Sequence, residues 1–120
     1  MIIAATGGRD FCEVRSGANH MHERRALGFA LDFLNPSKMI VGDAKGADRW
    51  VKIWCDKRGV PYEEFIADWG KLGKAAGPAR NQRMIDQKPD KVVRFPGGRG
   101  TADCAKRAAE AGIDVYEVKA

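Results

Sequence analysis

The sequence has few of the residues that bind metals or form disulfides. Its 120 residues include two histidines and three cysteines, and no two cysteines form a Cys-x-x-Cys pair. An odd number of widely spaced cysteines is typical of free thiols, so Cys12, Cys55 and Cys104 predict a cytoplasmic protein. His20 and His22 form one His-x-His pair without a second ligand cluster. This indicates a solvated helix start, and we expect no metal site and no cofactor.

Long hydrophobic runs are also missing. The apolar start MIIAAT gives way to GGRD, and no basic segment precedes it. This run is shorter than a membrane span and lacks the flanks of a signal peptide, so we expect a first strand and no membrane partner. The chain is 44% hydrophobic and 31% charged, which predicts one globular domain over residues 1–120. Its net charge of +5 favours an anionic partner.

The secondary-structure pattern alternates between short apolar runs and helical periodicity. The predicted strands cover residues 2–6, 38–42, 62–67, 91–95 and 113–118, and the predicted helices cover 20–34, 47–58, 78–87 and 101–111. This alternation is typical of βαβ units, so we expect an α/β fold: a Rossmann-like three-layer α/β/α sandwich with a mainly parallel sheet of about five strands. Residues 69–77 show no period and predict an irregular lid or binding loop.

Glycine-rich turns follow four of these strands. They are TGGRD (6–10), GDAKGAD (42–48), ADWGKLGKAAGPARN (67–81) and PGGRGTAD (96–103). All four lie at the carboxyl edge of the predicted sheet, where such folds bind ligands. Glycine lets backbone N–H groups approach an anion, and a helix N-terminus adds partial positive charge. Because four such turns converge, we predict a binding crevice rather than four tight turns.

The predicted ligand-binding residues come from all four turns. They are Gly7, Gly8, Arg9, Asp10, Gly42, Asp43, Gly46, Asp68, Trp69, Lys74, Arg80, Asn81, Pro96, Gly97, Gly98, Gly100 and Thr101. Residues 71–83 carry four positive charges and no negative one, so we expect Lys74 and Arg80 to hold a phosphate that sits over Gly97–Thr101.

The acidic and aromatic residues of these turns have alternative interpretations. Four carboxylates suit ribose hydroxyls or a base edge: Asp10, Asp43, Asp48 and Asp68. Asp10 also fits a local turn, and Asp43 and Asp48 also fit helix caps. Trp69 fits core or lid packing better than base stacking.

These motifs together resemble one known family over nearly the whole chain. TGGRDF (6–11), GDAKGAD (42–48), ADWGKLGKAAGPARNQRM (67–84) and FPGGRGTAD (95–103) are similar to the YspA-type branch of the SLOG superfamily. That superfamily is Rossmann-like and includes the LOG phosphoribohydrolases, the DNA-processing DprA proteins and nucleotide-sensing domains. For this branch, the resemblance implies a nucleotide-like or ADP-ribose-like ligand.

The resemblance to the LOG enzymes is incomplete. Pro96, Gly97, Gly98, Gly100 and Thr101 match their PGGxGTxxE loop, and Arg80 fits the arginine of their preceding helix. Cys104 occupies the position of the LOG catalytic glutamate. Asp103 comes one residue earlier, which on a helix points about 100° away. Members of the branch often carry His-Gly-Gly in the second turn, where this chain has Val41, Gly42 and Asp43.

We therefore expect a binding module for a phosphorylated nucleoside-type ligand: a nucleotide, ADP-ribose or an NAD-derived molecule, held as sensor, carrier or sponge. One alternative is a hydrolase of N-glycosidic or phosphate bonds, with Asp10, Asp43, Arg80 and Asp103 as candidate catalytic residues. DNA binding ranks last, because the sequence has no nucleic-acid-binding motif. The helix face that carries Trp50 and Trp54 fits either the core or a homodimer interface.

Overall fold

The sheet has five strands that all run in the same direction. The computed structural model describes all 120 residues, and its strands are β1 (Ile2–Thr6), β2 (Lys38–Gly42), β3 (Tyr62–Phe65), β4 (Lys91–Arg94) and β5 (Asp114–Glu117). They are parallel in the order β3-β2-β1-β4-β5. The predicted Rossmann-like α/β sandwich is confirmed. β3 ends at Phe65, two residues before its predicted end, because its partner β2 ends at Gly42.

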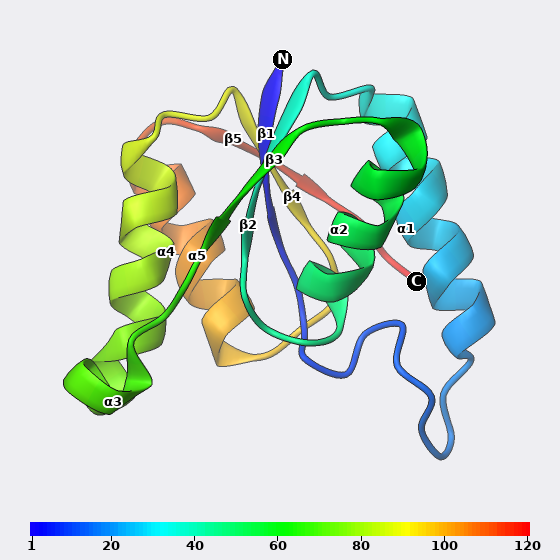
Figure 1. Cartoon of the computed structure of the whole chain (residues 1–120), viewed down its shortest axis with the longest axis horizontal. Helices are drawn as coiled ribbons and strands as arrows, with labels where there is room; N and C mark the ends of the chain where they lie inside the picture. Colours follow the sequence, from blue (N-terminus) through cyan, green and yellow to red (C-terminus); the bar gives the residue numbers. More distant parts are fainter.

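Helices cover both faces of this sheet (Figure 1). The helices α1 (His20–Leu34) and α2 (Ala47–Arg58) lie on one face and have their predicted bounds, whereas α4 (Ala76–Asp86) and α5 (Arg99–Glu110) lie on the other and each begin two residues early. The side chain of Asn19 caps the start of α1, and Gly59 ends α2 with a φ of 67°. Capping residues of this kind can be recognised from the sequence alone.

The segment between β3 and α4 is helical, so the prediction of an irregular loop over residues 69–77 is wrong. It contains a short helix α3 (Trp69–Leu72) and the 3-10 turn η1 (Gly73–Ala75) before α4 begins. The side chain of Asp68 accepts a hydrogen bond from the N–H of Lys71 at 3.0 Å and caps α3. Trp69 packs against Gly77, where an added Cβ would be 3.4 Å from the indole.

The core lies on both faces of the sheet, which explains the nearly continuous apolar strands. Ile3 and Met39 face the α1–α2 side, and the adjacent Ala4 and Ile40 face the α4–α5 side. Trp50 and Trp54 are partly buried against the α1–α2 core, which agrees with the core interpretation of that face. None of the helices has the length and apolar character needed to span a membrane.

Candidate functional site: a cavity at the carboxyl edge

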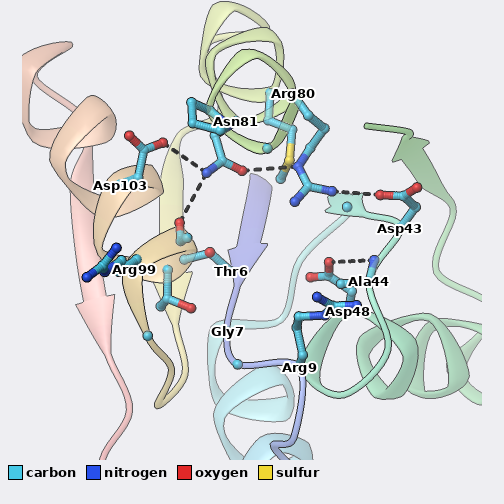
Figure 2. A pocket seen from close by; sticks show the side chains of 18 of the residues that line it. Thr6, Gly7, Arg9, Asp43, Ala44, Asp48, Arg80, Asn81, Arg99 and Asp103 are labelled. Atoms are coloured by element: carbon cyan, nitrogen blue, oxygen red, sulfur yellow. Dashed lines mark hydrogen bonds and ion pairs between the residues drawn. The ribbon is translucent and has the colours of Figure 1, made fainter. Parts of the chain in front are cut away.

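A cavity of about 750 Å³ lies at the carboxyl ends of β1, β2 and β4. Its walls come from the turns after these three strands, from α3 and α4, and from the first turn of α5 (Figure 2). In the strand order, β1 is central, and the chain leaves β1 and β4 toward helices on opposite faces. Such a divergence is where parallel α/β sheets open a crevice for ligands.

Most of the predicted site residues line this cavity. They are Gly7, Gly8, Arg9, Gly42, Asp43, Trp69, Lys74, Arg80, Asn81, Gly98, Gly100, Thr101 and Asp103. The predicted residues outside its lining are Asp10, Gly46, Asp68, Pro96 and Gly97. The four turns that were selected by their glycines therefore do meet in space.

The glycines outside the lining hold the turns against one another. An added Cβ on Gly46 would be 2.4 Å from the carbonyl oxygens of Gly8 and Arg9, and Gly46 has a φ of 80°. An added Cβ on Gly97 would be 2.1 Å from Thr101 Oγ1. Gly46 and Gly97 are thus required by packing, and they shape the cavity without facing it.

Gly98 and Gly100 differ, because neither close packing nor a positive φ accounts for them. An added Cβ at either position has no neighbour within 4 Å, and neither residue has a positive φ. Gly100 lies inside the first turn of α5, where glycine costs about 1 kcal/mol relative to alanine. No side chain caps this helix, so its first N–H groups keep their hydrogen-bonding capacity beside the cavity.

A hydrogen-bond network connects α4, on one side of the cavity, with the first turn of α5 (Figure 2). Arg80 donates from Nη1 to Asp43 Oδ1 at 2.8 Å and from Nε to Asn81 Oδ1 at 3.1 Å. Asn81 Nδ2 in turn donates to the carbonyl of Gly100 at 3.1 Å and to Asp103 Oδ2 at 3.0 Å. Arg80 and Asn81 are therefore fixed in place by the fold before any ligand arrives.

Asp48 is a buried carboxylate in the cavity wall. It is 5% exposed, and its Oδ2 accepts from the N–H of Ala44 at 3.1 Å. Burial raises its pKa to about 6, although the nearby charge of Arg80 lowers it. The helix-cap interpretation of Asp43 and Asp48 is wrong, since the N-cap of α2 is Gly46 and no side chain caps it.

Asp103, the candidate catalytic residue on α5, is held by hydrogen bonds. Burial alone would raise the pKa of Asp103, but hydrogen bonds from Arg107 and Asn81 hold it below its ordinary value. At the next position, burial raises the pKa of the Cys104 thiol to about 11, and Cys104 is not part of the cavity lining. The Cys104 thiol is thus neutral and lies outside the cavity.

Four exposed basic residues, which we call the basic rim, surround the cavity without ion-pair partners. They are Arg9, Lys45, Lys74 and Arg99. Sequence reasoning missed Lys45 and Arg99 as site residues, whereas it did consider Asp48 as a carboxylate of the crevice. The available signal was that each lies inside or directly at the end of a glycine-rich turn.

Comparison with known proteins gives a relative among phage proteins. No family model matches the chain. The chain is 37% identical over 84 residues to the "Gene 61 protein" of Mycobacterium phage D29, and the match covers 64% of this chain and 67% of the phage protein. The chain therefore belongs to the same protein family as this phage gene product.

Proposed function

We propose that this protein binds a phosphorylated nucleoside-type ligand, such as a nucleotide, ADP-ribose or an NAD-derived molecule, in the cavity at the carboxyl edge. The observation that carries the proposal is the first turn of α5. It is uncapped, it borders the cavity, and it contains Gly98 and Gly100, which the fold itself does not require. A helix N-terminus with open N–H groups attracts phosphate.

The size and charge of the cavity agree with such a ligand. Small-molecule sites commonly have volumes of about 300–1,000 Å³, and this cavity has about 750 Å³. The phosphate would lie over the first turn of α5 with Arg99 and Lys74 beside it. The remaining part of the ligand would extend toward β2, where Arg80 and Asp48 lie.

The same motifs support a proposed place in the YspA-type branch of the SLOG superfamily. Their glycine-rich turns line one cavity, as a nucleotide-binding member of that superfamily would require. The free thiols Cys12, Cys55 and Cys104 are all buried, and we propose that the protein works in a reducing, cytoplasmic compartment.

We limit the proposal to binding because the acidic residues considered as catalytic candidates are not arranged for hydrolysis. Asp10 is not among the lining residues, and Asp43 is paired with Arg80 at 2.8 Å. Asp103 accepts hydrogen bonds from Asn81 and Arg107. A general base needs a carboxylate that is free to take a proton.

A pair of glycine substitutions tests the proposal. Gly100→Ala and Gly28→Ala each add a methyl group in a helix where no atom lies within 4 Å, but only Gly100 lines the cavity. Both variants should fold and melt at or slightly above the wild-type temperature, because alanine favours helix by up to about 1 kcal/mol.

Calorimetric titration with AMP, ADP, NAD and ADP-ribose then separates the two variants. Gly100→Ala should bind the best of these at least about tenfold more weakly, since its methyl group keeps the phosphate from the N–H groups, while Gly28→Ala should stay within about twofold of wild type. The proposal fails if wild type binds none of the four, or if Gly100→Ala binds as tightly as wild type.

A further inference from the structure

Arg80 and Asp48 approach the same point above Gly42 without forming an ion pair. An added Cβ on Gly42 would be 2.4 Å from Arg80 Nη1 and 2.7 Å from Asp48 Oδ2. The Arg80 side chain is 12% exposed, Asp48 is 5% exposed, and both line the cavity. Even so, the ion pair of Arg80 is with Asp43, and no hydrogen bond joins it to Asp48.

Each of the two side chains has a hydrogen-bond partner outside the pair, as Figure 2 shows. Arg80 uses Nε and one N–H of Nη1 to bond Asn81 and Asp43, so its other donors have no protein partner. Asp48 accepts one hydrogen bond from Ala44, and no protein donor reaches its second oxygen. Two oppositely charged side chains of the cavity wall thus keep unused donor and acceptor capacity.

The chemistry of this pair selects what can bridge it. A phosphate or carboxylate oxygen would accept from Arg80 but be repelled by the carboxylate of Asp48. An ammonium group would donate to Asp48 but be repelled by Arg80. A hydroxyl group donates one hydrogen bond and accepts another, so it satisfies both residues at once.

We propose that Asp48 and Arg80 form a hydroxyl-binding subsite, in which one ligand hydroxyl donates to Asp48 and accepts from Arg80. This inference rests on the proposed function and narrows it, because the ligand must then be a phosphorylated sugar or nucleoside with a free sugar hydroxyl. Gly42 is part of the subsite, since any side chain there would fill the space between the two groups. Burial raises the pKa of Asp48 to about 6, so its ionised form is poorly solvated and gains from an added donor.

Matched nucleotides test the subsite. Calorimetric titration would compare AMP with 2′,3′-dideoxy-AMP, and the two monodeoxy nucleotides would show which hydroxyl is used. Wild type should bind AMP about 10-fold to 100-fold more tightly than the dideoxy compound, because loss of the hydroxyl removes one hydrogen bond from each of two charged groups that the ligand shields from water.

Asp48→Asn is the informative variant. Its amide oxygen can still accept from Ala44 in place of Oδ2, while its NH₂ group replaces Oδ1, the oxygen that has no protein donor, and offers no acceptor there for a hydroxyl proton. We expect this variant to bind AMP and 2′,3′-dideoxy-AMP within about threefold of each other. The control is Asp56→Asn, an exposed residue of the same helix, which should keep the wild-type preference.

The outcomes separate this inference from the proposed function. If wild type binds both nucleotides equally well, the subsite is disproved while the proposed function stands. A hydroxyl preference that survives in Asp48→Asn would also overturn the subsite, because the hydroxyl would then bind elsewhere. Binding of neither nucleotide, nor of the other ligands of the wider panel, would overturn both.

Discussion

At the scale of single residues, Asp48 lowers the stability of the fold at neutral pH while it provides a group for ligand binding. The carboxylate of Asp48 is buried, and its pKa rises from an ordinary 3.8 to about 6 on folding. Between these two pH values the folded state binds more protons than the unfolded state, so the free energy of unfolding falls as the pH rises. Above about pH 6 the full cost of the buried charge remains. A costly buried carboxylate in a cavity wall is typical of functional sites.

The first prediction is that Asp48→Asn stabilises the protein at neutral pH. A pKa difference of one corresponds to about 1.4 kcal/mol, so the gain should approach about 3 kcal/mol at pH 7 and vanish near pH 4. Urea unfolding of both proteins across this pH range measures it. If the two stability curves stay parallel from pH 4 to pH 7, burial of Asp48 does not have the assigned cost.

A second residue-scale prediction concerns Gly42. In Gly42→Ala the new methyl group would overlap Arg80 Nη1 and Asp48 Oδ2, so both side chains must move. We expect a loss of about 1–3 kcal/mol in the free energy of unfolding, typical of overpacking, together with loss of the hydroxyl preference. Gly98→Ala is the control, since it adds a methyl group into open space. Equal stability of the two variants in urea would contradict the described packing.

At the scale of elements, Asn81 couples α4 to the start of α5. Asn81 is 4% exposed and donates to both the Gly100 carbonyl and Asp103. We expect Asn81→Ala to cost about 1–3 kcal/mol, because a buried side chain is truncated and two partly buried acceptors lose its hydrogen bonds.

The same variant should loosen the first turn of α5 in particular. Amide hydrogen exchange should speed up in residues 102–105, whose N–H groups are the first in α5 to be bonded within the helix, more than in α1, which makes no contact with this network. Exchange that rises equally in both helices, or in neither, would show that Asn81 does not anchor α5.

The elements that sequence predicted best are those with local end signals. α1 and α2 have their predicted bounds because Asn19, Asn35 and Gly59 mark their ends. α4 and α5 begin two residues before Pro78 and Thr101, where the sequence predicts their starts, and neither helix has a side-chain cap to mark its first turn. α3 has four residues, which is too short for a helical period to show.

The site was predictable in its location but not in its details. Glycine-rich turns after parallel strands place the cavity, because a parallel sheet brings those turns to one edge. Sequence does not reveal that Gly97 packs against Thr101 while Gly98 faces open space. The burial of Asp48 likewise depends on how α2 and α4 meet over Gly42, which no local pattern encodes.

At the scale of the whole molecule, the basic rim should make anion binding depend on salt. Its four side chains are exposed and have no ion-pair partners, so added ions screen their attraction for a phosphate. We expect nucleotide affinity to fall at least several-fold between about 50 mM and about 500 mM NaCl.

Two variants that each remove one positive charge test whether the basic rim, rather than the net charge, attracts the nucleotide. Arg99→Gln should weaken nucleotide binding by at least about fivefold, while Lys57→Gln, which removes the same charge at the end of α2, should have less than about a twofold effect. Equal losses in the two variants would mean that net charge, rather than the rim, attracts the ligand.

The central claim is that a phosphorylated nucleoside sits on the first turn of α5. The most direct test is an NMR titration that follows each backbone amide while AMP or ADP-ribose is added. The amide signals of Gly98, Gly100 and Thr101 should move most, and that of Gly28 should stay in place. Signals that do not move with any nucleotide, or whose largest shifts lie on the α1–α2 face, would contradict the account.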